Sequence, residues 1–332
     1  MWKKTVNRIL SFVIFLIIFI MGTNWVIDPY MKFRKATYIN PIYNTDTERY
    51  LNAGIAKYNE YNAVLIGTSM TENFLIKDIN SFLNINSIKL SYSGGTAKEF
   101  SHLIEWVFKQ NKCKSILFGF DVLSFQNFDS YNGYQRGVVF PHYMYKNDIL
   151  SDLEYLFAWK TSIASVETMK HTFDKNVDSD LEYNYAYTWY QGQQADRNKV
   201  IEDWNSRNDV KHQEIFSKKN YEYSILVKNY KMYLRPSIIS NPQINFVIFF
   251  PPYSYLAWEL SKERGSYSNI QKFKSYVLND LKNQKNVEIY DFQNEEEIIK
   301  HLEYYKDIEH YSEKINLWMI QQIANKKYKV TF

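Results

Sequence analysis

One short segment restricts the fold of this chain more than any other. Residues 62–67 are mostly apolar and rich in branched side chains, and Ser69 follows them closely. Such a run predicts a buried strand, a tight turn and the start of a helix. A serine on this turn would project its hydroxyl from the carboxyl edge of a sheet, beside the free N–H groups of the helix. That position suits a nucleophile, because the same amides can bind a developing oxyanion. A purely structural turn explains the pattern equally simply, so a catalytic role requires a base elsewhere in the chain.

Further apolar runs predict the rest of a sheet. The additional strands are expected over residues 87–92, 115–120, 245–250 and 286–290. Helices are expected over Thr45–Tyr58, Thr96–Gln110, 268–283 and Ser312–Asn325. Short apolar strands that alternate with amphipathic helices are typical of α/β proteins, so we predict a doubly wound, mainly parallel five-stranded sheet. Ligands of such sheets bind outside the carboxyl ends of the strands.

The N-terminal region predicts a membrane anchor. An apolar run begins at Ile9 and extends to Ile27 over about 19 residues, close to the roughly 20 that a bilayer requires. Basic residues precede the run, and Trp25 and Tyr30 lie where an interfacial aromatic belt would be. A cleaved signal peptide is the alternative, but residues 21–25 do not offer a convincing Ala-x-Ala cleavage site.

This anchor sets the expected domain organisation. We predict a cytoplasmic tail over 1–8, a single-pass anchor over 9–27, a juxtamembrane segment over 28–61 and an extracytoplasmic catalytic domain over 62–332. The contrast in positive charge that supports this orientation is blurred, because Lys32, Arg34 and Lys35 lie on the far side of the anchor.

The long stretch between the third and fourth predicted strands does not fit a single crossover. We predict a partly helical insertion over about 122–243, above the carboxyl edge of the sheet. It is rich in aromatic residues, most densely over residues 182–190. Exposed rings would stack on sugar faces, whereas buried rings would pack the insertion against the sheet, and both interpretations stay open.

The overall composition excludes several classes of function. The net charge of +4 is spread over 332 residues without a basic block, which argues against a nucleic-acid-binding protein. The single cysteine excludes an internal disulfide and a cysteine-based metal site. His, Asp and Glu residues show no spacing typical of a metal site, and no glycine-rich loop is suited to phosphate, so we expect neither a metal nor a cofactor.

A candidate base lies near the C-terminus. Asp307 and His310 are three residues apart in one predicted loop, just before the last helix. In this arrangement the carboxylate can orient one ring nitrogen while the other accepts a proton from a serine. An exposed polar turn that caps the helix through Ser312 is the alternative explanation for these residues.

These motifs occur in an order that resembles the SGNH (GDSL-type) hydrolase superfamily. The resemblance rests on Gly67-Thr68-Ser69, Ser93-Gly94-Gly95-Thr96 and Asp307-x-x-His310, and covers roughly residues 60–120 and 244–325. It implies that Ser69 is the nucleophile, His310 the base and Asp307 the orienting acid. It also implies an oxyanion hole formed by the amides of Ser69 and of Gly94 or Gly95, with Asn73 as a further candidate.

One motif departs from the family pattern. The family usually has an asparagine after the third strand, which donates a side-chain N–H to the oxyanion, and this chain has Asp121 there. An ionised carboxylate accepts hydrogen bonds and cannot donate them. The departure speaks against high hydrolytic activity, and a catalytically silent glycan-binding scaffold on the same fold is a second hypothesis.

The anchor, the Asp28-Pro29-Tyr30 exit and the Gly-Thr-Ser-Met-Thr-Glu-Asn turn over residues 67–73 resemble a narrower group, the membrane-tethered SGNH-like proteins. This group includes the D-alanyl-lipoteichoic acid transfer protein and polysaccharide O-acetylation proteins, which work with membrane-bound O-acyltransferases. The resemblance implies transfer of an acyl group, acetyl or similar, to a surface polysaccharide or teichoic acid, through an acyl-Ser69 intermediate. An esterase that removes acyl groups from the same polymer is the alternative.

Overall fold

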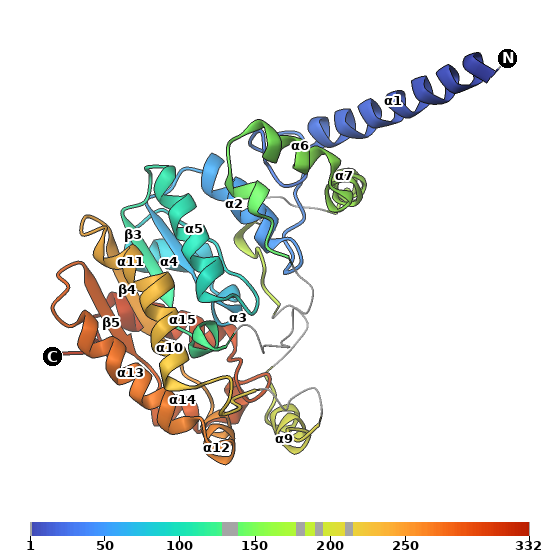
Figure 1. Ribbon diagram of the computed structural model, residues 1–332. Coiled ribbons are helices and arrows are strands. Elements are labelled where there is room, and N and C mark those ends of the chain that lie inside the picture. Colours follow the sequence, from blue (N-terminus) through green and yellow to red (C-terminus); the bar gives the residue numbers. More distant parts are fainter. Residues whose placement is uncertain (1, 128–138, 177–182, 190–194, 210–214, 332) are drawn as a thin grey trace. The chain divides into compact units, whose positions relative to one another are not determined.

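The computed structural model describes residues 2–127, 139–176, 183–189, 195–209 and 215–331 (Figure 1). The chain forms two compact units. The first, here called the helical unit, comprises Met1–Asn59 and Phe140–Tyr183. The second, the sheet unit, comprises Glu60–Val139 and Asn184–Phe332. Part of the predicted insertion therefore groups with the N-terminal segment and part with the sheet.

The sheet unit contains five parallel strands in the order β2-β1-β3-β4-β5. The strands are β1 (Ala63–Ile66), β2 (Ser87–Lys89), β3 (Ser115–Gly119), β4 (Asn245–Phe250) and β5 (Val287–Asp291). The predicted α/β fold is thus confirmed, although β2 ends before the predicted residue 92. All four residues of β1 are buried, as expected for a parallel strand that is covered on both faces.

Helices cover both faces of this sheet (Figure 1). On one face α4 (Ile76–Leu83) packs against α15 (Glu313–Ala324). The other face carries α5 (Ala97–Lys109), α10 (Tyr223–Asn229), α11 (Arg235–Ile239) and α13 (Tyr267–Leu281). The remaining helical segments of the unit are α3 (Ser69–Glu72), η1 (Val122–Phe125), α9 (Arg197–Asn205), the π-helix η4 (Tyr230–Leu234), α12 (Tyr255–Glu263), α14 (Glu296–Ile299) and η5 (Leu302–Tyr304).

Aromatic packing accounts for part of the tyrosine-rich insertion. Tyr187, Tyr221 and Tyr230 are almost completely buried, so these rings pack inside the sheet unit and are not available to a sugar. Trp189 is half-buried. Glu182 and Tyr190, at the two ends of the densest aromatic stretch, lie outside the described residues.

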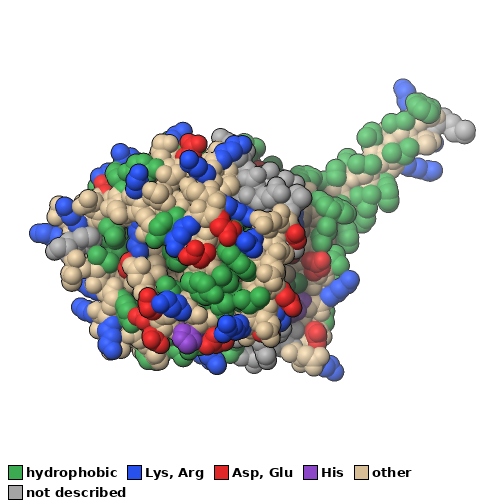
Figure 2. Space-filling view, turned by 90° about the horizontal axis from the view of Figure 1, so that it is seen from below, with side chains coloured by type: hydrophobic (Ala, Val, Ile, Leu, Met, Phe, Trp, Pro, Cys, Tyr) green, Lys and Arg blue, Asp and Glu red, His purple; other side chains and the backbone are tan. Residues whose placement is uncertain are grey.

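The helical unit consists of α1 (Trp2–Ile27), α2 (Glu48–Tyr58), η2 (His142–Tyr145), α6 (Ile149–Phe157) and α7 (Trp159–Thr172). Among the described residues, α1 is the one helix that is long and apolar enough to cross a membrane, and only 6% of its apolar window is buried. Hydrophobic side chains cover its length, with basic side chains near its N-terminal end (Figure 2). An N-terminal signal sequence would have the same length and composition.

Candidate active site

The turn after β1 presents Ser69 at the first position of α3. Thr68 is the N-cap of this helix, and its hydroxyl accepts a hydrogen bond from the Met70 N–H. The buried Thr71 side chain stabilises this turn, since its hydroxyl donates a hydrogen bond to the Thr68 carbonyl over 2.8 Å. Gly67 is required here because a Cβ atom would lie 2.5 Å from Thr71 Cγ2. Ser69 itself is only half-buried.

The structure brings Ser69 together with the predicted base. The Oγ atom of Ser69 lies 2.8 Å from Nε2 of His310, although the two residues are 241 positions apart. On the other side of the ring, Nδ1 lies 2.8 Å from Oδ2 of Asp307 and 3.0 Å from Oδ1. In the tautomer that carries a proton on Nδ1, the ring donates to Asp307 and Nε2 can accept the serine proton. This is the arrangement of a Ser-His-Asp triad.

The loop that carries the acid and the base favours their charged forms. Oδ1 of Asp307 accepts hydrogen bonds from the backbone N–H groups of Glu309 and His310, over 2.9 and 2.7 Å. Burial of Asp307 opposes its ionisation, but His310 and these amides outweigh burial and lower the pKa of Asp307 to about 2. Burial likewise opposes protonation of His310, but the Asp307 carboxylate outweighs it and raises the pKa of His310 to about 9.

Glu309 lies between the acid and the base in sequence and was not among the predicted site residues. Burial, together with the nearby carboxylates of Asp307, Asp121 and Asp203, raises the pKa of Glu309 to about 8. The positive charge of His310 acts in the opposite direction on the pKa of Glu309, and a charge on Glu309 in turn raises the pKa of His310.

Asp121 is used to hold the nucleophile turn. One carboxylate oxygen accepts a hydrogen bond from the Thr68 hydroxyl over 2.6 Å, and the other accepts from the Tyr253 hydroxyl and from the Leu123 N–H. Thr68 follows β1, Asp121 follows β3 and Tyr253 follows β4, so the buried carboxylate ties three strand ends together. Sequence reasoning missed both hydroxyl partners, since nothing in the pattern places Tyr253 beside this turn.

The predicted oxyanion donors differ in whether their backbone N–H groups already form hydrogen bonds within the protein. The Gly95 N–H donates to the Tyr92 carbonyl over 2.9 Å, and a Cβ at Gly95 would lie 2.5 Å from Phe100 Cζ. Gly94 has a φ of 57°, which favours glycine. Within the described residues, the N–H groups of Ser69 and Gly94 make no hydrogen bond. Of the two glycine candidates, Gly94 is therefore the one whose N–H is not already used in a hydrogen bond among the described residues.

Trp189 joins the site from the predicted insertion. Its backbone N–H donates to Oδ1 of Asn73 over 3.2 Å, and its indole Nε1 donates to the Ser69 carbonyl over 3.3 Å. The indole ring contacts His310 edge to face at 5.3 Å, and Nζ of Lys306 lies 4.4 Å from its centre. The density of aromatic residues was the only sequence signal for this contact.

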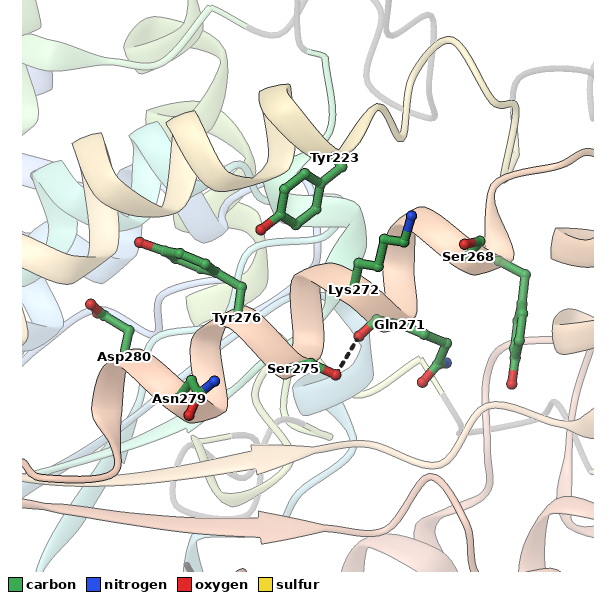
Figure 3. Close-up of a pocket in the computed structure, with 9 residues that line it drawn as sticks. Tyr223, Ser268, Gln271, Lys272, Ser275, Tyr276, Asn279 and Asp280 are labelled. Atoms are coloured by element: carbon green, nitrogen blue, oxygen red, sulfur yellow. Dashed lines mark hydrogen bonds between the residues drawn. The ribbon is translucent and has the colours of Figure 1, made fainter.

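A surface groove on α10 and α13 offers no comparable chemistry. Its lining includes three tyrosines, Tyr223, Tyr267 and Tyr276, and two serines, Ser268 and Ser275 (Figure 3). Ser275 donates its hydroxyl proton to the Gln271 carbonyl of its own helix. No histidine lines the groove, so neither serine has an imidazole base there.

In the described ranges, no group of three His, Cys, Asp or Glu residues could hold a metal ion. Scanning the chain against models of protein families gave no match, and a search of curated proteins gave none either. The triad geometry therefore stands as the main structural observation on which a function can be argued.

Proposed function

We propose that this protein is a membrane-anchored, extracytoplasmic acyl-ester enzyme of the SGNH type. The observation that carries the proposal is the triad, in which Ser69 Oγ, His310 Nε2 and the Asp307 carboxylate lie within hydrogen-bond distance in series. Asp307 and His310 lie in one loop. Their side chains are 26% and 23% exposed, respectively, so a substrate can approach them from solvent.

The first half of the reaction would form the acyl-enzyme. Ser69 Oγ attacks the carbonyl carbon of an ester while its proton passes to Nε2 of His310. The N–H groups of Ser69 and Gly94 would bind the oxyanion of the tetrahedral intermediate. When the intermediate collapses, the bond to the leaving alcohol breaks and this oxygen takes the proton from His310.

The second half would return the serine. A hydroxyl group gives its proton to His310, and its oxygen attacks the acyl carbon and displaces Ser69 Oγ, which recovers the proton. Water as acceptor gives hydrolysis, and a sugar or polyol hydroxyl gives transfer. Two features favour a large, immobilised acceptor. One is α1, which would retain the protein at a membrane, and the other is the Trp189 ring, which contacts His310. We therefore propose acyl transfer to a surface polysaccharide or teichoic acid, with a membrane-bound O-acyltransferase as the partner that supplies the acyl group.

An activated serine can be tested directly with a fluorophosphonate probe. Such probes react with a serine that has a functional base, so the wild-type protein should be labelled, whereas Ser69→Ala and His310→Ala should lose nearly all labelling. Ser275→Ala is the matched control, because Ser275 is bonded within its own helix, and it should label like the wild type. Folded wild-type protein that stays unlabelled but binds glycan would replace this proposal with the scaffold hypothesis.

The direction of the reaction can be read from the polymer itself. Cells that carry Ser69→Ala should lose O-acyl groups from the surface polymer, as measured by mass spectrometry against the wild type and Ser275→Ala. An increase of acyl groups in the Ser69 variant would show that the enzyme removes them and would replace transfer by deacylation.

A further inference from the structure

Helix α6 carries its large apolar side chains on the solvent side. Ile149, Leu150, Leu153 and Phe157 are all exposed, Ile149 and Leu150 by 77% and 78%. At about 100° of rotation per residue, the four fall within a single arc of about 100°. The buried positions of the same helix are Ser151 and Tyr155. This is the reverse of the usual amphipathic helix, whose apolar stripe faces the core.

Helix α7 has the same reversed arrangement, with apolar side chains toward solvent and polar or small ones toward the protein. Its buried positions hold small or hydroxyl-bearing residues, namely Thr161, Ala164, Ser165 and Thr168. Its exposed apolar residues lie on the opposite side of the helix and are Trp159, Ile163, Val166 and Met169. Phe173, directly after the helix, is exposed as well. A soluble surface rarely exposes so many large apolar side chains on two consecutive helices.

Buried hydrogen bonds attach both helices to the C-terminal end of α1. The side-chain amide of Asn24 donates to the Leu156 carbonyl over 2.8 Å and to the Ser162 hydroxyl over 3.0 Å. The Ser165 hydroxyl donates to Oδ1 of the same asparagine over 2.9 Å. Asn24 is 1% exposed, so these bonds form inside the contact between α1, α6 and α7.

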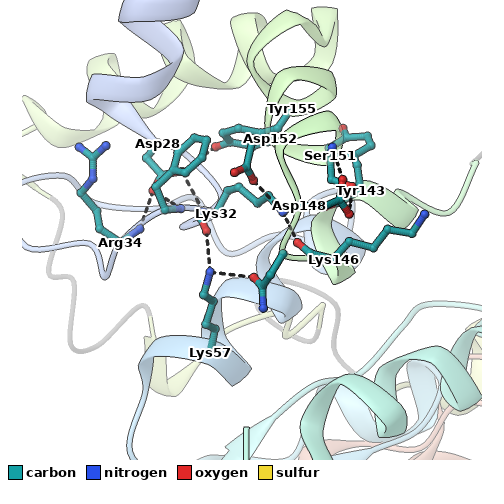
Figure 4. A network of polar contacts seen from close by, with 12 residues as sticks. Asp28, Lys32, Arg34, Lys57, Tyr143, Lys146, Asp148, Ser151, Asp152 and Tyr155 are labelled. Atoms are coloured by element: carbon teal, nitrogen blue, oxygen red, sulfur yellow. Dashed lines mark hydrogen bonds and ion pairs between the residues drawn. The ribbon is translucent and has the colours of Figure 1, made fainter. Parts of the chain in front are cut away.

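A second polar network fixes the chain where it leaves α1 (Figure 4). The Asp28 carboxylate accepts hydrogen bonds from the Tyr155 hydroxyl over 2.9 Å and from the backbone N–H groups of Lys32, Phe33 and Arg34. Lys32 forms an ion pair with Asp152 of α6 over 3.4 Å. The polar face of α6 is thus turned inward by specific contacts, and its apolar face is turned outward.

We infer that α6 and α7 lie in the interface of the membrane that α1 crosses, with their outward apolar faces in lipid. The inference rests on the membrane placement in the proposed function. Lipid is the occupant that fits, because both helices contact α1, the candidate membrane span, whose own exposed apolar surface includes Trp25 and Val26. Lys160 and Lys170 are exposed on α7 and can extend to lipid headgroups, as basic residues of interfacial helices do.

Site-directed fluorescence can test this with the full-length protein. In a Cys113→Ser background, single cysteines replace Leu150 on α6 and Ile163 on α7, and each is labelled with the fluorophore NBD. Ser11→Cys on α1 is the lipid control, and Lys300→Cys, whose native side chain is 58% exposed, is the water control. The proteins are reconstituted at low density in phosphatidylethanolamine–phosphatidylglycerol vesicles, with or without lipid that carries a nitroxide on its acyl chain.

Labels at Leu150 and Ile163 should show blue-shifted emission and lose fluorescence with the nitroxide lipid, as the label at Ser11 does. The label at Lys300 should instead lose fluorescence with aqueous iodide. Quenching of the α6 and α7 labels by iodide would overturn the inference, and so would protection from both quenchers, which would indicate a second copy of the chain on these faces. If the Ser11 label is also reached only by iodide, the membrane placement itself fails, which distinguishes that failure from the failure of α6 and α7 alone.

Discussion

At the scale of single residues, the proposed reactivity of Ser69 would depend on the protonation of His310. Only the neutral ring can accept the Ser69 proton at Nε2, and the neighbouring Asp307 raises the pKa of the ring to about 9. A raised pKa of a base means that the active, unprotonated form becomes dominant only as the pH rises through that value. The same carboxylate that orients the ring therefore limits the fraction of active base at neutral pH.

We predict that the rate of fluorophosphonate labelling rises with pH and levels off above about 9. In Asp307→Asn the midpoint should move down toward the ordinary histidine value near 6.5, because the stabilising carboxylate is lost. The plateau rate should also fall, by on the order of 10³–10⁴-fold, since the ring is no longer held in the productive tautomer.

Glu303→Gln is the matched control for this profile. Glu303 contacts Nδ1 of His301 over the same 2.8 Å distance, but this pair is exposed and is not part of the triad. Its removal should leave midpoint and plateau unchanged. A wild-type midpoint near 6.5 that Asp307→Asn does not move would contradict the coupling between Asp307 and His310.

At the scale of elements, the ends of β1 and β3 fit together around one threonine. The methyl group of Thr71 in α3 occupies the space beside both Gly67 and Gly119, where neither position leaves room for a Cβ atom. The Thr71 hydroxyl also bonds to the Ser91 hydroxyl over 2.7 Å, after β2. Two glycines and one threonine thus set how closely α3, and with it Ser69, approaches the edge of the sheet.

We predict that Gly119→Ala destabilises the sheet unit by about 1–3 kcal/mol, because the added methyl group overlaps Thr71 Cγ2. Adding Thr71→Ser removes the overlapping methyl group, keeps the hydroxyl and should recover part of the loss. Thermal unfolding in detergent measures both effects. Gly22→Ala, where a Cβ meets nothing within 4 Å, should not destabilise the protein, and a double variant no more stable than Gly119→Ala would refute the overlap.

The elements also show what the sequence could and could not predict. The five strands follow from short, branched apolar runs, and Thr96 forms a capping box with Glu99 at the start of α5, close to the predicted boundary. The approach of Ser69, Asp307 and His310 was predicted only through the order of motifs. Trp189 was missed because it lies in a segment without periodicity, and its contacts depend on tertiary packing. Apolar periodicity identifies a helical stripe but not what the stripe faces, so the outward faces of α6 and α7 required the structure.

At the scale of the whole molecule, two of the three charges that blurred the predicted orientation, those of Lys32 and Arg34, form contacts within the fold. Lys32 is buried and paired with Asp152. The Arg34 guanidinium lies 4.3 Å from the Trp25 ring and donates to the Trp25 and Val26 carbonyls, which caps the C-terminal end of α1. Both cations therefore have a structural role in the helical unit.

We predict that the protein stays in the membrane fraction after a carbonate wash, because the apolar surface of α1 is almost wholly exposed. Protease added to spheroplasts should digest the sheet unit but not a tag placed before Trp2. A soluble, processed form that begins near residue 25 would contradict the anchor, and protection of the sheet unit would reverse the orientation.

The wide separation of Ser69 and His310 along the chain has a consequence for biosynthesis. Ribosomes make proteins from the N-terminus, so α1 and the serine emerge long before the histidine, which lies 241 positions later. During that interval the serine has an ordinary, unreactive hydroxyl. If the proposed function holds, the chain therefore has no complete triad until its C-terminal part is made, and a product that ends between Ser69 and Asp307 would retain α1 and the serine but could never acquire the base.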